Sequence, residues 1–399
     1  MSKNTKFSGK PIISQVLSLL DKHKINRTAK KNKSDRYYKK FKTIDHLVTM
    51  LYVVLSCCSS LREITGIMLA CEGRINHLGI DNFPKRSTIS DANKKRSSKV
   101  FQEIYYDIFN SYSKIISDSR INDKVIKELM IIDSTTISLF CDILKGTGRE
   151  PINGKKKGGI KMHTMINAAE DVPCLIRLTS ATVHDHTFLK DLNLKKGSIV
   201  VFDKGYNDYK QFAKWEKEEI YFVTRIKSNA KYNSVNEYDI ADDIDSGVIK
   251  DEKIEIANGK EILQLCKVGY WDEKNRRLFE FITNNFNFPA DKIAEIYKRR
   301  WQMKLLFKRL KQSFPLKYFL GDSINAIEIQ IWVSLIAQIL LLVIQKLSKK
   351  RWAFSNLMSV IRFHLMTYID LFAFLANPDS GWDNLKSKSD DQLELFSSA

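Results

Sequence analysis

Residues 129–140 read LMIIDSTTISLF, and this stretch decides the fold class of the chain. Its apolar and β-branched residues are typical of a buried strand. One carboxylate, Asp133, interrupts the run. Burying a lone carboxylate is costly, so Asp133 requires a cation, hydrogen bonds or access to water. The stretch therefore predicts a core strand that carries one chemically distinctive acid.

The sequence after this strand alternates between strand and helix patterns. Strands are expected at 160–169, 172–181, 197–206 (GSIVVFDKGY) and 220–226, a short helix at 184–192, and a longer helix at 209–218. This order predicts a mixed α/β sheet. Residues 228–287 differ, because hydrophobic alternation on both sides of Asn258-Gly259 indicates a hairpin. We interpret them as a small β-rich insertion.

Helical spacing dominates the sequence before residue 128. Residues 1–45 hold thirteen Lys or Arg against three acids, which is typical of either a solvated face or a DNA-contacting arm. The stretch FPKRSTISDANKKR (83–96) is interpreted as a short helix capped by Ser87, and as a candidate second helix of a helix-turn-helix. Both alternatives for the basic arm stay open.

The formal net charge of +19 directs the chain toward polyanions, and nucleic acid is the first candidate. The alternative is a basic structural or RNA-associated protein. Six cysteines show no zinc or disulfide spacing, which indicates a reducing compartment. The N-terminus has no apolar signal-peptide core, and the apolar run 331–344 is interpreted as a buried core helix. We therefore expect a cytoplasmic protein with no membrane partner.

A second acid, Asp203, follows the apolar run of the 197–206 strand. If the ends of the two strands are adjacent in one sheet, Asp133 and Asp203 reach a shared Mg²⁺. Two such ions can activate water and stabilise a leaving oxygen in phosphodiester chemistry. The alternative is that each Asp only caps a strand-to-turn junction. His184-Asp185-His186 lacks a third metal ligand, and we interpret Asp185 as a helix-start cap.

Five stretches together resemble the DDE transposases of bacterial insertion sequences, in the insertion-sequence-four family. They are IIDSTTISLF, KKKGGIKMHT, VVFDKGY, the helix around Tyr297, and PLKYFLGDSINAIEIQIWVSLIAQ. The resemblance covers roughly residues 5–376 and implies a ribonuclease-H-like mixed sheet with a β-rich insertion and a helical N-terminal domain. It also implies Mg²⁺ or Mn²⁺ as cofactor, double-stranded DNA (element ends and target) as partner, and a homodimer in the DNA complex. The first two family acids fall on Asp133 and Asp203.

The third family motif, Tyr-x2-Arg-x3-Glu-x6-Lys, is matched by Tyr297, Arg300 and Lys311, but Lys304 stands at the Glu position. On one continuous helix over 290–312, a basic and aromatic face is expected opposite an apolar stripe. The residues predicted to bind DNA on this face are Tyr297, Arg300, Trp301, Lys304, Lys308 and Lys311. Trp301 is a candidate for stacking on a displaced base.

Lys304 places positive charge where the resemblance implies a metal ligand. It would raise the cost of binding a divalent cation, or form a salt bridge with Asp133 or Asp203. No other acid on the helix reaches this face, since Glu295 lies on the opposite side.

The sequence thus predicts a cut-and-paste DNA transposase, cytoplasmic and nucleoid-associated, with catalytic Asp133 and Asp203 and impaired strand cleavage. The alternative is a catalytically inactive, transposase-derived DNA-binding protein. The expected division is 1–127 helical and DNA-binding, 128–227 first part of the core, 228–287 insertion, 288–376 core completion with C-terminal helices, and 377–399 polar tail.

Overall fold

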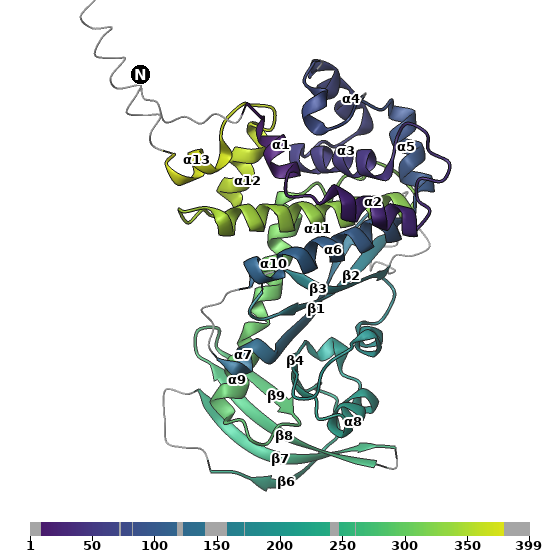
Figure 1. The fold of residues 1–399 in the computed structure, drawn as a ribbon. Coiled ribbons are helices and arrows are strands. Elements are labelled where there is room, and N and C mark those ends of the chain that lie inside the picture. Colours follow the sequence, from purple (N-terminus) through teal and green to yellow (C-terminus); the bar gives the residue numbers. More distant parts are fainter. Residues whose placement is uncertain are drawn as a thin grey trace, which may run out of the picture. The chain divides into compact units, whose positions relative to one another are not determined.

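The computed structural model describes residues 9–71, 73–81, 83–117, 123–139, 158–170, 172–239, 247–259 and 261–378 (Figure 1). The chain forms two compact units. One comprises the chain up to Ile115 together with the chain from Leu310 onward, and the other comprises Ile116–Arg309. The first unit is helical, and the second holds every strand of the described residues.

The second unit is built on one nine-stranded mixed sheet in the order β3-β2-β1-β4-β5-β9-β8-β7-β6. The strands are β1 Leu129–Ser138, β2 Gly159–Asn167, β3 Pro173–Ser180, β4 Ile199–Val201, β5 Tyr221–Arg225, β6 Asn233–Glu237, β7 Val248–Asn258, β8 Glu261–Asp272 and β9 Arg277–Thr283. β1, β4 and β5 are parallel neighbours, and the other pairs are antiparallel. The predicted α/β class and mixed sheet are confirmed.

The register of the parallel strands sets the position of the two acids. Val201 is level with Ile131 on one side and with Val223 on the other. Since β4 ends at Val201, a continuation by two residues puts Asp203 between Asp133 and Arg225. Asp133 lies in the middle of β1, so its predicted position at a strand end is wrong. The reason is that β1 stays paired with β2 as far as Ser138 after β4 has ended.

The region after β5 continues the same sheet, because β9 pairs with β5. The predicted hairpin at Asn258-Gly259 is present between β7 and β8, and Gly259 takes the positive φ of 67° that such turns favour. Helix α8 (Tyr209–Lys217), capped by Asp208, packs aromatic side chains onto the sheet. Phe212 and Phe222 stack with ring centroids 4.1 Å apart.

The predicted helix over 290–312 is interrupted, and the prediction of one continuous helix is wrong. Helix α9 (Ala290–Arg299) begins after Pro289, and α10 (Trp301–Ser313) follows it. At the junction the Arg300 amide donates to the Tyr297 carbonyl at 3.1 Å, a bond to the third rather than the fourth residue back. This tightens the turn. The predicted apolar stripe of α10 is confirmed by the burial of Met303, Leu306, Phe307 and Leu310.

The first unit is a helical assembly around α11 (Ile324–Leu347). Its other helices are α1 Ile12–Leu17, α2 Lys22–Lys31, α3 Thr43–Ser56, α4 Leu61–Ala70, η1 Ile75–Leu78, α5 Arg86–Lys95, α6 Ser98–Ile116, α12 Phe354–Phe363 and α13 Leu371–Ala376. The remaining short elements are α7 Lys124–Glu128, η3 Asp185–Asp191 and η4 Lys204–Tyr206, all in the sheet unit.

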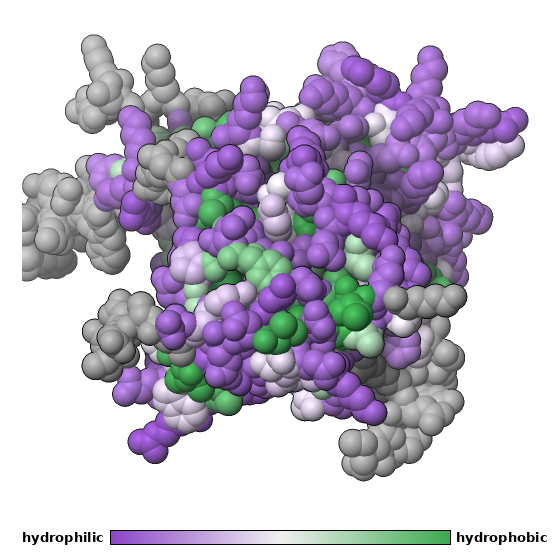
Figure 2. Space-filling view, turned by 90° about the horizontal axis from the view of Figure 1, so that it is seen from below, coloured by the Kyte–Doolittle hydropathy of each residue, from purple (hydrophilic) through white to green (hydrophobic). Residues whose placement is uncertain are grey.

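Helix α11 is long and apolar enough to cross a membrane, but 94% of its most apolar window is buried inside the protein. That is typical of a core helix, as the sequence predicts for 331–344. The face in Figure 2 is mostly hydrophilic, with hydrophobic residues in small separate groups.

Two local predictions in the chain fail for identifiable reasons. Ser87 does not cap α5, because the helix begins at Arg86 and Lys85 occupies the cap position without a side-chain hydrogen bond. Asp185 does not cap the 184–192 helix, since its carboxylate accepts a hydrogen bond from the Ser134 hydroxyl at 2.9 Å. The short helix itself is present as η3. The cysteines among the described residues are free, and Cys141 lies outside them.

Candidate active site

Asp133 and Asp203 converge on one guanidinium group. Arg300 Nη1 donates to Asp133 Oδ2 at 2.8 Å, and Arg300 Nη2 lies 3.8 Å from Asp203 Oδ1. The side chains of Arg300 and Asp133 keep only 13% and 16% of their exposure, so this pair is largely shielded from water. The prediction that β1 and β4 bring the two acids together is confirmed.

Asp203 has two further donors on the same oxygen. Arg225 Nη2 lies 2.8 Å from Asp203 Oδ1, and the Tyr297 hydroxyl lies 3.1 Å from it. Arg225 comes from the end of β5, where the parallel register places it beside Asp203. Asp133 Oδ1 accepts the Ser134 amide at 2.9 Å. The two aspartates therefore form ion pairs with two arginines of the same chain.

The surroundings shift the pKa values of the two carboxyl groups in opposite directions. Burial raises the pKa of Asp133, and Arg300 opposes this rise only in part. Burial also acts on Asp203, but Arg300 and Arg225 outweigh it and lower the pKa of that carboxyl. Burial raises the pKa of Tyr297 to about 12. Environments that separate the pKa values of two neighbouring acids are typical of sites that carry out acid–base or metal chemistry.

A cavity of about 1,220 Å³ opens beside the acid pair. Cationic and aromatic side chains of β5, β8, β9, α9 and α10 dominate its lining, and two acids, Asp272 and Glu273, line it at the β8–β9 turn. The cationic and aromatic lining includes Arg225, Tyr270, Tyr297, Lys298, Arg300, Trp301 and Lys304. Lys298 Nζ lies 4.6 Å from the Tyr270 ring centroid and donates to the Tyr270 hydroxyl at 2.7 Å, and Lys304 Nζ lies 4.6 Å from the Trp301 ring centroid. Such a lining suits phosphate groups and stacked bases.

The six residues predicted to bind DNA do not share one environment. Tyr297 is buried and Arg300 is mostly shielded against the acid pair, whereas Trp301, Lys304 and Lys308 are exposed. The reason is that the Tyr297 hydroxyl and the Arg300 guanidinium pair with Asp203 and Asp133, whereas the exposed side chains make no contact with the acids. Lys311 is exposed and belongs to the helical unit, beyond the boundary at Leu310.

The predicted salt bridge from Lys304 to Asp133 or Asp203 is wrong. Arg300 forms the ion pairs with both acids, and the Lys304 ammonium lies over Trp301 instead. Lys304 still acts on the acid through space, because its charge contributes to lowering the pKa of Asp133.

Comparison with known families gives a match over more than half of the chain. The family described as "Transposase DDE domain" matches residues 126–340, which contain β1, β4, α9 and α10. The chain belongs to the transposase DDE domain family. Residues 8–81 also match a domain of unknown function, DUF4372.

Curated relatives agree with this membership. A protein of Sinorhizobium fredii assigned as transposase y4zB is 29% identical over 67% of this chain and 73% of its own length. The transposase assigned to insertion sequence element IS4SA of Synechocystis sp. is 28% identical over 64% and 70%. The one assigned to IS5377 of Geobacillus stearothermophilus is 24% identical over 64% and 68%. A piggyBac transposase synaptic complex with hairpin DNA aligns at 11% identity over 94% and 83%, with a TM-score of 0.42, too low to carry a conclusion.

The donor set of this transposase-family chain fits a divalent cation only in part. Two carboxylates at matching levels of adjacent strands suit the oxygen preference of Mg²⁺. A third acid does not join them, since the described residues contain no group of three acidic, His or Cys ligands. Glu295 pairs with Lys292 at 2.9 Å and with Arg299 at 3.5 Å. Position 304, where the resemblance implies the third acid, is a lysine in this chain.

One cluster beside the acids was missed by the sequence analysis. Asp185 accepts from Ser134, lies 3.2 Å from Lys161 Nζ, and lies 3.7 Å from Nδ1 of the buried His163. The His163 ring reaches the Tyr206 hydroxyl at 3.4 Å. Burial lowers the pKa of His163 to about 4, so the ring is neutral at neutral pH. The usable signal was the alternation of Lys161 and His163 with Ile160, Met162 and other apolar residues of β2.

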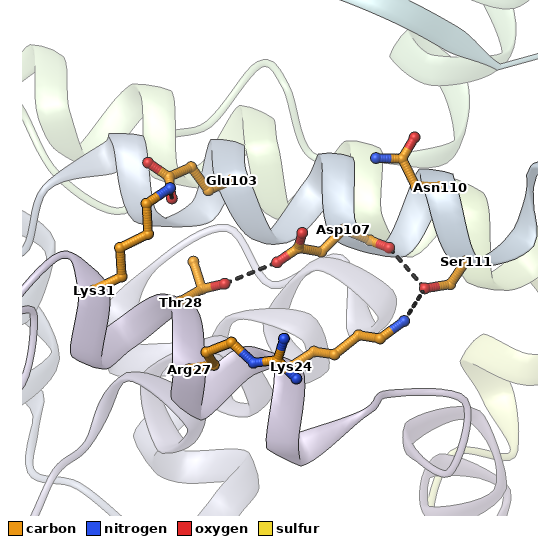
Figure 3. A pocket seen from close by; sticks show the side chains of 8 residues that line it. All are labelled: Lys24, Arg27, Thr28, Lys31, Glu103, Asp107, Asn110 and Ser111. Atoms are coloured by element: carbon orange, nitrogen blue, oxygen red, sulfur yellow. Dashed lines mark hydrogen bonds and ion pairs between the residues drawn. The ribbon is translucent and has the colours of Figure 1, made fainter.

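The helical unit has a separate cavity of about 380 Å³ between α2 and α6 (Figure 3). Lys24 donates to the Ser111 hydroxyl, Thr28 donates to Asp107, and Lys31 pairs with Glu103 at 3.0 Å. Most polar groups of this cavity therefore bind each other, which is typical of a packing interface between helices. Asp133 and Asp203, by contrast, lie beside the larger cavity of the sheet unit.

Proposed function

We propose that this chain is a DNA transposase of the insertion-sequence-four type that recognises insertion-sequence ends, with strand cleavage and strand transfer weakened by Lys304. The observation that carries the proposal is the convergence of Asp133 and Asp203 on Arg300, beside a cavity lined by cations and aromatic rings. Membership of the transposase DDE domain family supports the reaction class.

Asp133 and Asp203 would hold Mg²⁺ or Mn²⁺ on this proposal. A bound divalent cation would supply activation of water and stabilisation of the leaving oxygen. Because Arg300 and Arg225 already neutralise the acids, these arginines must turn toward another anion when a cation is present. The phosphates of the DNA strand are that anion, since guanidinium groups bind phosphate through two parallel hydrogen bonds.

The remaining predicted DNA-binding residues take roles that follow from their exposure. Trp301 is 60% exposed and offers a flat ring for stacking on a displaced base. Lys304, Lys308 and Lys311 supply charge to the DNA backbone. Tyr297 is buried, so on this proposal its contribution is to position Asp203 through the hydroxyl hydrogen bond.

Lys304 weakens the chemistry for an electrostatic reason. A third carboxylate would add negative charge to a pair whose charge two arginines already balance. An ammonium group adds positive charge, which disfavours a divalent cation at the same place. The alternative function, a catalytically inactive DNA-binding protein, draws on the same observation, since the cationic cavity binds DNA whether or not a strand is cut.

The test compares the full chain with Lys304→Glu on duplex DNA carrying the ends of the element that encodes the chain. Band shifts report binding and gel analysis of labelled strands in Mg²⁺ or Mn²⁺ reports nicking. We expect both proteins to shift end DNA and the variant to nick it faster. Equal, robust nicking by both proteins would refute the impairment. A shift without nicking by either protein would favour the inactive DNA-binding alternative, and no preference for end DNA would refute both functions.

On this proposal the partner is double-stranded DNA and the protein acts in the bacterial cytoplasm on the nucleoid. A homodimer that bridges two element ends is proposed from the family resemblance. Sedimentation of the chain with and without end DNA tests that assembly state.

A further inference from the structure

Helix α5 (Arg86–Lys95) presents a polar, basic face. It lies between the two matched family regions, residues 8–81 and residues 126–340. Its buried side is formed by Ile89, Ala92 and Asn93. The opposite side is exposed to solvent. Its residues are three or four positions apart in the sequence, so they lie on one face of the helix. These exposed residues are Ser87, Asp91, Lys94 and Lys95, with Lys85 and Arg86 at the start of the helix.

Buried polar contacts fix this helix firmly to the helical unit. His46 and the Asn93 side chain are joined by a hydrogen bond of 2.8 Å in the core. The Asn325 side chain of α11 donates to the carbonyls of Asn93 and Arg96 at 2.8 and 2.7 Å. Because burial lowers the pKa of His46 to about 3, the ring stays neutral and the contact is stable at neutral pH. The exposed face of α5 is therefore presented on a rigid support.

A basic loop is anchored next to the end of α5. The buried guanidinium of Arg96 donates to the Phe41 carbonyl at 2.9 Å, pairs with Asp35 at 3.3 Å, and lies 4.3 Å from the Tyr38 ring centroid. Arg96 thus ties the loop between α2 and α3 to the residue that follows α5. The exposed residues of this loop include Lys33, Arg36, Tyr37, Lys39 and Lys40.

Helix α4 is the competing candidate for contact with DNA. The axes of α3 and α4 differ by 95° across a break of four residues or fewer, which matches the helix pair of a helix-turn-helix. The exposed side of α4 nevertheless carries Leu69, which is 73% exposed, beside Gly66 and Ala70. Arg62 is its one exposed cation. Charge complementarity to phosphate therefore selects α5 and the loop rather than α4.

We infer that α5 is the sequence-reading helix of this chain, inserted into the major groove of duplex DNA, with the loop at residues 33–40 on the flanking backbone. The inference rests on the proposed function and adds a second DNA site to it. The exposed α5 side chains match the chemistry of base edges. Ser87 donates or accepts, Asp91 accepts from a cytosine amino group, and Lys94 donates to guanine acceptors. Lys85 and Arg86 lie at the helix start, where phosphate contacts position such helices.

The test is selection of bound sequences from a library of random duplexes by the full chain. We expect the wild type to enrich one motif. The triple variant Ser87→Ala/Asp91→Ala/Lys94→Ala removes one acid and one base, so its net charge is unchanged. It should bind random duplex as the wild type does, yet lose at least about tenfold in affinity for the selected motif. Lys85→Ala should weaken binding to all duplexes and lower the salt slope by about one.

Matched controls separate failure of the inference from failure of the proposed function. Lys349→Ala removes an exposed charge of the helical unit far along the sequence and should leave the motif affinity unchanged. Circular dichroism and thermal melting establish that each variant is folded. Absence of any duplex binding by the wild type would refute the proposed function itself. Binding without an enriched motif, an unchanged motif in the triple variant, or loss of the motif in Arg62→Ala instead would overturn the role of α5 alone.

Discussion

The ion pair between Arg300 and Asp133 can be tested without DNA or metal. Replacing Arg300 by Met keeps length and removes the charge, which leaves Asp133 buried without its cation. At the 2.8 Å contact the charge centres are about 4 Å apart, which corresponds to about 4 kcal/mol at an effective dielectric constant of 20. Breaking one side of a buried pair costs about 3–5 kcal/mol. We expect Arg300→Met to lower the free energy of unfolding by that amount at neutral pH.

The assay is urea unfolding of the full chain followed by circular dichroism, with a double-mutant cycle. Asp133→Asn in the Arg300→Met background removes the stranded charge, so the double variant should recover most of the loss. The sign of the pH dependence follows from the carboxyl group. Burial raises the pKa of Asp133, and loss of Arg300 raises it further. The penalty should therefore shrink as the pH falls below the pKa of Asp133 in the variant. A loss below about 1 kcal/mol, with additive single changes, would refute the pairing.

Three other substitutions test separate parts of the structure. Tyr297→Phe removes the hydroxyl donor to Asp203. It should lower the free energy of unfolding in urea by about 1–2 kcal/mol and raise the pKa of the Asp203 carboxyl. An unchanged stability would contradict the hydrogen bond. Burial acts on Glu252, but Lys267 and Ser234 outweigh it and lower its pKa to about 2. The ionised Glu252 stabilises the folded chain above the ordinary pKa of 4.5, and this stabilisation is lost as the pH falls toward 2. Over that pH range the wild type should therefore lose about 3 kcal/mol of unfolding free energy that the Glu252→Gln variant does not lose. Phe212→Ala should lower the unfolding free energy by about 3–5 kcal/mol, and a thermal melt matching the wild type would contradict its place in the core.

Much of the sheet was predictable because its strands carry strong local patterns. β1 and β5 are largely apolar or β-branched runs, and the hairpin between β7 and β8 is marked by Asn258-Gly259. β6 was missed because Asn233–Glu237 is exposed along its whole length and has no hydrophobic alternation. Local patterns report burial, so an edge strand that buries nothing leaves little trace in the sequence.

The acids of the site were predictable, but their partners were not. Asp133 and Asp203 stand out as charges in apolar runs. Arg225 and Arg300 reach them only through the register of β5 and the turn between α9 and α10. A helix period of 3.6 residues cannot reveal the single tightened turn at Arg300. It also cannot reveal that Tyr297 is buried against Asp203 while Lys304 lies over Trp301. Asp185 was assigned to a helix cap because its tertiary partner Ser134 is distant in the sequence.

Binding of Mn²⁺ measured by electron paramagnetic resonance tests the central claim most directly. On this account Asp133 and Asp203 are metal ligands, and the lysine at position 304 repels the ion. Lys304→Glu should bind Mn²⁺ at least about tenfold more tightly than the wild type, and adding Asp133→Asn should abolish that gain. Equal affinity in the wild type and Lys304→Glu, or tight binding that survives Asp133→Asn, would contradict the account.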